Sequence, residues 1–127
     1  MNSVLDASAL LALLHNEKGA DRVEEAIFNK AVISSVNWAE VIQKVIAKNI
    51  SVDNLDNELA AVGLSFLSFD RQQASIAGSL WQQTKKLGLS LGDRACLALA
   101  QQLDLPVLTA DKIWQRLDIG VSNQLIR

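Results

Sequence analysis

Residues 89–100, LSLGDRACLALA, decide the fold, because they describe a helix that has no polar face. From Ala95 onward this stretch is wholly apolar. A helix that is hydrophobic all round is buried inside a protein, so we expect a helix over 91–103 to be surrounded by other elements. Two opposite charges, Asp93 and Arg94, nevertheless stand in its first turn. Charges at the mouth of a buried helix need a reason other than solubility.

The rest of the chain alternates short apolar runs, rich in β-formers, with longer helical ones. The predicted strands cover 3–5, 31–35, 65–69, 106–109 and, weakly, 119–125. The predicted helices cover 7–14, 18–29, 37–48, 52–62, 71–87, 91–103 and 112–117. Strands that alternate with helices predict parallel pairing with helical crossovers on both faces of a sheet. We therefore predict an α/β fold, a three-layer α/β/α sandwich with a central, mostly parallel five-stranded sheet.

The composition is that of a soluble globular protein, with 50% hydrophobic and 20% charged residues in a chain of 127. No repeat or Pro/Gly-rich linker divides it, so we expect residues 1–127 to form a single domain. No apolar run reaches the roughly 20 residues that span a bilayer, and no signal-peptide pattern opens the chain. The single cysteine, Cys96, cannot form an internal disulfide. These features favour a cytoplasmic protein that does not enter a membrane.

The charge balance limits the kinds of partner. The formal net charge is −2, whereas a protein that binds nucleic acid mainly by neutralising phosphates is usually basic. This charge argues against a large nonspecific nucleic-acid surface. It leaves open an enzyme that holds a phosphodiester through bound metal ions.

Four acidic residues stand where a predicted strand gives way to a helix. Asp6 closes the first strand, Glu40 and Asp93 lie in the first turns of the helices over 37–48 and 91–103, and Asp111 follows the fourth strand. Because ligands gather at the carboxyl ends of parallel strands, we expect these four side chains to meet at one edge of the sheet.

Helix capping offers a simpler explanation for each acid taken alone. Asp6 and Asp111 have the position of N-caps, and Asn37 with Glu40, like Ser90 with Asp93, has the spacing of a capping box. Acids are also favoured near helix N-termini by the macrodipole. For any single residue, a cap and a catalytic role are about equally well supported.

Taken together, four carboxylates at one sheet edge would repel one another and raise each other's pKa values. A bound cation removes that penalty. Mg²⁺ and Mn²⁺ prefer oxygen ligands and commonly combine carboxylates with water and a substrate phosphate. Such ions activate water and stabilise charge on a phosphodiester, so the pattern indicates metal-dependent chemistry with Asp93 directed at a metal.

Four blocks of the sequence resemble, in order, those of the PIN domain family: SVLDASALLALL (3–14), SSVNWAE (34–40), LSLGDRACLALA (89–100) and LPVLTAD (105–111). The length resembles that of VapC-type toxins of bacterial toxin–antitoxin pairs. The resemblance implies an Mg²⁺- or Mn²⁺-dependent ribonuclease whose acids are Asp6, Glu40, Asp93 and Asp111. It also implies an RNA substrate, a homodimer, and an antitoxin protein that covers the acidic site.

Several other polar and aromatic residues have both a functional and a simpler structural explanation. Ser8 and Thr109 could hydrogen-bond a carboxylate or a metal-bound water, or simply cap the backbone. Arg94 is expected to pair with a neighbouring acid rather than an RNA phosphate. The pairs Lys44/Lys48 and Lys85/Lys86 could line an RNA path, although a solvated helix face explains both better. His15 is expected to end its helix, and Trp38, Trp81 and Trp114 to pack in the core.

Two other classes of protein stay open at this point. A receiver domain or a haloacid-dehalogenase-like phosphatase also has an Asp after an early strand, but here Asp6 is followed by Ala7-Ser8 and neither the paired acids nor Asp-x-Asp is present. A non-enzymatic partner-binding protein could keep the acids only as a docking or metal-stabilised site. Metal-dependent cleavage of RNA separates these readings.

Overall fold

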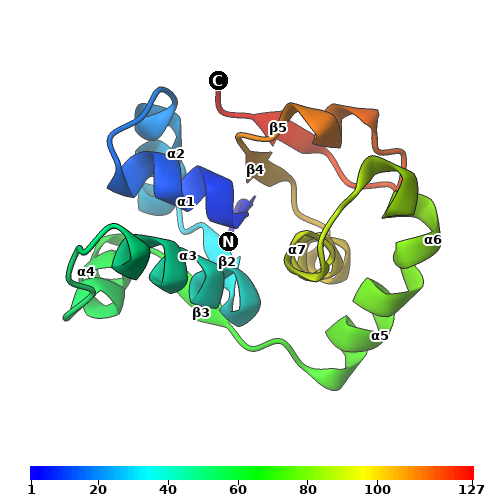
Figure 1. Ribbon diagram of the computed structural model, residues 1–127, viewed down its shortest axis with the longest axis horizontal. Helices are drawn as coiled ribbons and strands as arrows, with labels where there is room; N and C mark the ends of the chain where they lie inside the picture. Colours follow the sequence, from blue (N-terminus) through cyan, green and yellow to red (C-terminus); the bar gives the residue numbers. More distant parts are fainter.

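The computed structural model describes residues 1–127 and contains one five-stranded sheet with helices on both faces (Figure 1). The strands are β1 (Val4–Leu5), β2 (Val32–Ser34), β3 (Ser65–Leu67), β4 (Val107–Thr109) and β5 (Asn123–Leu125). The helices are α1 (Ala7–Leu14), α2 (Ala20–Phe28), α3 (Ser35–Ala47), α4 (Leu55–Val62), α5 (Arg71–Ser79), α6 (Trp81–Thr84) and α7 (Leu91–Leu103), with 3-10 segments η1 (Lys85–Leu87) and η2 (Lys112–Arg116). None of these helices is both long and apolar enough to cross a membrane.

The sheet has the order β3-β2-β1-β4-β5, and every neighbouring pair is parallel. The two residues of β1 lie at its centre, with Leu5 opposite Ile33 on one side and Leu108 on the other. Parallel strands need crossover connections, and here each crossover includes at least one helix or 3-10 segment. The predicted three-layer α/β/α sandwich is confirmed, and the sheet is wholly parallel.

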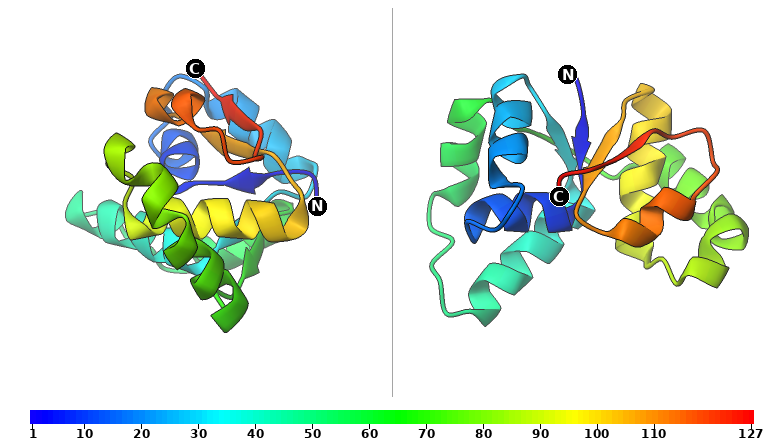
Figure 2. Two further views of the ribbon diagram at one scale, coloured as in Figure 1. Left: turned by 90° about the vertical axis from the view of Figure 1, so that its right-hand side faces the viewer. Right: turned by 90° about the horizontal axis from the view of Figure 1, so that it is seen from above.

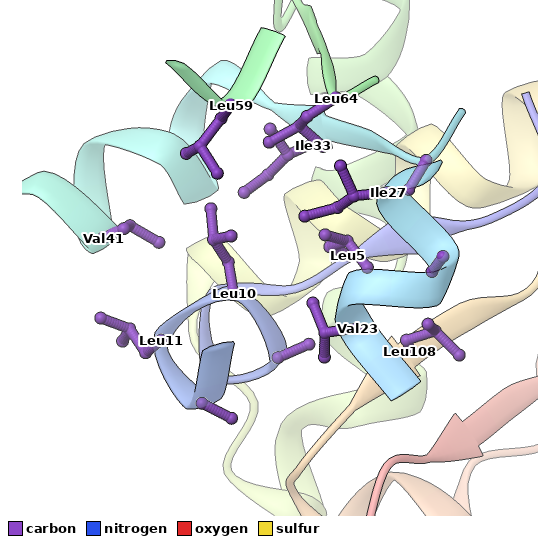
Figure 3. Packing of buried hydrophobic residues seen from close by; sticks show 14 of the residues in the cluster. Leu5, Leu10, Leu11, Val23, Ile27, Ile33, Val41, Leu59, Leu64 and Leu108 are labelled. Atoms are coloured by element: carbon purple, nitrogen blue, oxygen red, sulfur yellow. The ribbon is translucent and has the colours of Figure 1, made fainter. Parts of the chain in front are cut away.

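Successive strand residues point to opposite faces of the sheet, so β1 supplies one residue to each of two cores. Leu5 packs with α1, α2, α3 and α4 in a cluster of 16 buried residues. Val4 packs with α7 and Trp114 in a second cluster of 10. The two groups of helices lie on either side of the strands in the right-hand view of Figure 2. In the first core, Leu10 of α1 approaches Leu59 and Ile33 (Figure 3).

The predicted burial of α7 is confirmed. Every residue from Ala95 to Ala100 is at most 1% exposed, because the sheet, α3 and α5 pack around the helix (Figure 1). The second core includes Cys96, Leu97 and Leu99, as expected for a helix that has no polar face. The helix is thus a fixed support for whatever its first turn carries.

The single long helix predicted over 71–87 is wrong. The structure ends α5 at Ser79, restarts as α6 after Leu80, and finishes in η1 before Gly88, which has a φ of 70°. The hydroxyls of Ser75, Ser79 and Thr84 each donate to the carbonyl four residues earlier, at 3.2, 2.9 and 2.9 Å. Such back-bonding bends helices, and the bends let Leu80 reach the second core.

Several predicted boundaries also move. The third helix begins at Ser35 rather than at 37, because the Ser34 hydroxyl caps it by accepting from the Val36 amide at 3.2 Å. The helix predicted to begin at 52 begins at Leu55, after Asn54 in the left-handed region. The last strand is confined to Asn123–Leu125. Short, half-buried segments such as these give weak sequence signals, since few residues fix their period.

Two glycines provide a matched test of the packing between α4 and α2. Gly63 has a φ of 126°, and a Cβ there would overlap the Ile27 carbonyl oxygen, whereas a Cβ at Gly78 in α5 would meet no atom within 4 Å. We expect Gly63→Ala to lower the free energy of unfolding by about 2 kcal/mol or more. Gly78→Ala should raise it by up to about 1 kcal/mol, as helix propensity requires. Urea unfolding of both variants measures this, and equal effects would contradict the proposed close contact.

Candidate active site

Asp6 lies directly after the central strand, and its side chain is only 4% exposed. It caps α1, because Oδ1 accepts from the Ala9 amide at 2.8 Å and from the Ser8 hydroxyl at 2.7 Å. Oδ2 accepts from the Thr109 hydroxyl at 2.6 Å. Both polar residues assigned to this edge, Ser8 and Thr109, therefore bind the Asp6 carboxylate.

The electrostatic state of Asp6 follows from its burial without a cationic partner. Burial raises the pKa of Asp6 to about 6, against the lowering by the hydrogen bonds from Thr109, Ala9 and Ser8. The charge of Asp93 raises this pKa further, which places the two carboxylates close enough to repel. A cation between them would reverse the penalty.

Glu40 reaches the same edge from α3, where Asn37 holds it. The Asn37 amide Nδ2 donates to Glu40 Oε1 at 2.8 Å and to the Gly92 carbonyl at 2.9 Å. Asn37 is 1% exposed, so this side chain is a buried clamp between α3 and the start of α7. The predicted capping role for Asn37 is wrong, because Ser34 already caps the helix one turn earlier.

The absence of a side chain at Gly92 lets Glu40 lie against α7. A Cβ added at Gly92 would stand 2.6 Å from the Glu40 carboxylate atoms Cδ, Oε1 and Oε2, well inside van der Waals contact. Glu40 can therefore keep this position on α3 only because residue 92 is a glycine.

Asp93 completes the capping box that the sequence predicts. Its Oδ2 accepts from the Ser90 amide at 2.9 Å, while the Ser90 hydroxyl accepts from the Asp93 amide at 3.1 Å. Its other carboxylate oxygen has no hydrogen-bond partner, and the residue is half-buried. Capping fixes the backbone of Asp93 and leaves one oxygen for a ligand.

Asp111 joins the network through its backbone. Its amide donates to Thr109 Oγ1 at 3.0 Å, and Thr109 in turn donates to Asp6. The Asp111 side chain caps η2 by accepting from the Ile113 amide at 3.1 Å, and it is exposed. Of the four acids, Asp111 is thus the one held on the shortest element.

Three of the acids lie close enough to the buried thiol of Cys96 for their charges to affect it. Burial raises the pKa of the Cys96 thiol well above its usual value, and the charges of Asp6, Asp93 and Glu40 raise it further. Cys96 stands one turn after Gly92 on α7. The charges of these carboxylates therefore converge on the N-terminal part of α7.

The acidic side chains can be compared with what a divalent metal ion needs. As they stand, no three acidic, histidine or cysteine side chains form a group ready to hold an ion. Glu40, Asp93 and Asp111 nevertheless each keep one carboxylate oxygen without a partner. Hard ions such as Mg²⁺ and Mn²⁺ bind carboxylate oxygens, so the residue types fit.

Arg94 and Trp81 depart from their predicted roles, whereas Trp114 and Trp38 do not. Arg94 makes no ion pair, because its guanidinium Nη1 donates to the Ala77 carbonyl of α5 at 2.9 Å. Trp81 is half-exposed and lies beneath Lys85, whose Nζ is 4.8 Å from the ring centroid. Trp114 is fully buried as predicted, and Trp38 packs edge-on against Phe66 with ring centroids 4.9 Å apart.

Sequence patterns could not have found the Asn37 clamp, since Asn37 and Gly92 lie 55 residues apart in the chain. The only hint was an amide three residues before an acid, and that spacing also fits a cap. The link from Asp111 through Thr109 to Asp6 was equally hidden, although both acids were expected at this edge.

The fold and its acids define an α/β protein with a carboxylate-rich site at the carboxyl edge of a parallel sheet. Residues 3–120 match the sequence model of the PIN domain, and the chain belongs to the PIN domain family. No curated protein sequence matches the chain.

Solved structures share the fold. A toxin–antitoxin complex from Klebsiella pneumoniae superposes with a TM-score of 0.71 at 23% identity, covering 89% of this chain and 90% of that one. VapBC-1 from nontypeable Haemophilus influenzae superposes with a TM-score of 0.72 at 22% identity, covering 99% of this chain and 98% of that one. FitAcB from Neisseria gonorrhoeae superposes with a TM-score of 0.72 at 21% identity, covering 95% of this chain and 96% of that one.

The raised pKa of Asp6 predicts a pH dependence of stability in metal-free protein. The folded state holds the Asp6 proton more tightly than the unfolded state, so stability falls as pH rises from 3.8, the ordinary pKa of an aspartate, to about 6. Asp6→Asn removes this dependence. Relative to the wild type, the variant should gain about 2 to 3 kcal/mol between about pH 4 and about pH 8. Urea unfolding in EDTA measures the gain, and parallel curves for the two proteins would show that Asp6 titrates normally.

Proposed function

We propose that this protein is an Mg²⁺- or Mn²⁺-dependent endoribonuclease that acts as the toxin of a bacterial toxin–antitoxin pair. One observation carries the proposal: a chain of the PIN domain family retains Asp6, Glu40, Asp93 and Asp111 at one edge of its sheet. Three of these carboxylates keep a free oxygen. When bound, the ion would polarise a phosphodiester oxygen and lower the pKa of a water.

The residues take different parts in this proposal. Asp6 and Asp93 are the primary metal ligands, because Asp93 keeps a free carboxylate oxygen and Asp6 Oδ2 accepts only one hydrogen bond. Glu40 completes the ligand set or orients the attacking water, with its carboxylate held by Asn37. Asp111 holds an outer water or a second ion, which suits its exposed position on η2. Ser8 and Thr109 orient the Asp6 carboxylate through its two oxygens.

The proposal includes protein partners. The neighbouring structures are toxin–antitoxin complexes, and we propose that an antitoxin covers the acidic site of this chain. An apolar cavity of about 230 Å³ is lined by Leu13, Ile27, Phe28 and Val62. Because Phe28 is 61% exposed, this cavity is a second surface that the antitoxin could contact. We further propose a single domain over 1–127, a homodimer and a cytoplasmic location, and light scattering of the purified protein tests the dimer.

Carboxylate substitutions test the assignment. Asp6→Asn, Glu40→Gln and Asp93→Asn should each lower metal-dependent RNA cleavage by at least about a hundredfold, because each removes a ligand or an oriented water, and Asp111→Asn should lower it less. Cleavage of mixed bacterial tRNA and ribosomal RNA in Mg²⁺ is measured, with EDTA as a blank. Circular dichroism melting reports whether each variant folds.

The matched control is Asp70→Asn. Asp70 caps α5 by accepting from the Gln73 amide at 2.8 Å, as Asp6 and Asp93 cap their own helices, but it is not part of the acidic site. Its variant should cleave at the wild-type rate. Full cleavage by Asp93→Asn would contradict the site, and metal binding without cleavage of any RNA would favour the non-catalytic partner-binding protein.

Gly92 gives a test that leaves every carboxylate in place. Gly92→Ala puts a methyl group 2.6 Å from the Glu40 carboxylate, so Glu40 must move while Asp6 and Asp93 stay. We expect cleavage to fall by about tenfold or more, as a displacement of about 1 Å does in other active sites. Ala should otherwise favour the helix, so an undiminished rate in a stable variant would show that Glu40 has no fixed role.

A further inference from the structure

A polar cavity adjoins the acidic site and contains the Lys44/Lys48 pair, which the sequence alone assigned to a solvated helix face. It measures about 380 Å³ and lies between α1, the C-terminal half of α3 and Arg127. Ser8 lines one end, and the Ser8 hydroxyl donates to Asp6 at 2.7 Å. Only the Ser8 side chain therefore separates the cavity from Asp6.

The cations in this cavity are not neutralised. Lys44 and Lys48 line it, and neither has a carboxylate within ion-pair distance, because the one ion pair in the structure joins Arg127 to Glu17 at 3.5 Å. Glu17 also lines the cavity, so its charge and that of Arg127 offset each other. Two unpaired positive charges remain in a protein of net charge −2.

His15 also lines the cavity. Its Nδ1 lies 3.4 Å from Lys48 Nζ, and an ammonium group can only donate, so Nδ1 accepts from Lys48. The other ring nitrogen, Nε2, is buried and is not available to a ligand. Lys44 and Lys48, which are both exposed, are therefore the cationic donors that a ligand in the cavity can reach, and His15 positions Lys48.

The register of α3 links the cavity to the acids. Glu40, Lys44 and Lys48 follow one another at intervals of four residues on one face of α3, so each step advances about 6 Å along the axis. Favourable interaction with the helix dipole explains a lysine at the C-terminus of α3. It does not explain why two lysines and His15 share a concave surface next to Ser8.

We propose that Lys44 and Lys48 in this cavity bind backbone phosphates of single-stranded RNA beside the bond that is cut. The proposal rests on the ribonuclease function proposed above and adds the path of the substrate. A polyanion crossing four carboxylates is repelled by them, and cations next to the site offset this repulsion. Because RNA is the chain that must lie across the acids, the observations favour it over an acidic protein segment.

The test measures RNA binding rather than cleavage. In an Asp93→Asn background, the affinity for a short fluorescein-labelled single-stranded RNA of mixed sequence is followed by anisotropy over a series of NaCl concentrations. Adding Lys44→Gln and Lys48→Gln should weaken binding by about tenfold and reduce the slope of log Kobs against log salt by about 1.4, since each phosphate contact contributes about 0.7. Lys44→Arg with Lys48→Arg should restore both.

The matched control is Lys85→Gln with Lys86→Gln, which removes the same charge from η1 and should leave the slope unchanged. An equal loss in both pairs would overturn the cavity in favour of a general charge effect. Lost binding of polyglutamate with unchanged RNA binding would overturn it in favour of an acidic protein partner. If the lysine substitutions reduce the salt slope as expected but the wild-type protein cuts no RNA, the proposed function is overturned and the proposed phosphate-binding role of the cavity is not. If the wild-type protein cuts RNA but the lysine substitutions leave the salt slope unchanged, the role of the cavity is overturned and the proposed function is not.

Discussion

A buried carboxylate with no cation beside it is the constraint on which the acidic edge of this structure depends. Asp6 is 4% exposed and accepts three hydrogen bonds, from the Ala9 amide and the Ser8 and Thr109 hydroxyls. An ionised group is costly to bury unless its lone pairs are satisfied. The need to satisfy Asp6 thus ties the first turn of α1 to the end of β4, and Thr109 extends the tie to the Asp111 amide.

In this protein the carboxylates that cap helical segments are also those that form the acidic edge of the sheet. Asp6, Asp93 and Asp111 all accept from a backbone amide at the start of a helical segment. A capping carboxylate uses one oxygen and is held at the end of a strand or in a first helical turn, where the sheet edge lies. A capping role, which was balanced against a functional role for each acid taken alone, is therefore compatible with the metal-binding role proposed for these acids. Glu40 is the exception, and it needs Asn37 to hold it.

The sequence predicted the parallel sandwich, the buried α7 and the association of the acids with strand ends, because each depends on local period and element order. It failed where an outcome depended on distant partners. Arg94 donates to the Ala77 carbonyl instead of pairing with an acid, since α5 approaches α7 closely there. The bend at Leu80 likewise depends on the second core, which helical periodicity alone does not reveal.

The charges at the mouth of α7 can now be explained by the helix behind them. Arg94 ties α7 to α5 through Ala77, and Asn37 ties α7 to α3 through the Gly92 carbonyl. With its apolar length buried on all sides, α7 has little freedom to shift, since close-packed interiors do not deform continuously. Asp93 therefore has a backbone fixed by packing and by its capping box, while one carboxylate oxygen stays free. For the metal-ligand role proposed for Asp93, an apolar helix with a charged first turn holds the carboxylate in a fixed position at the boundary of the core.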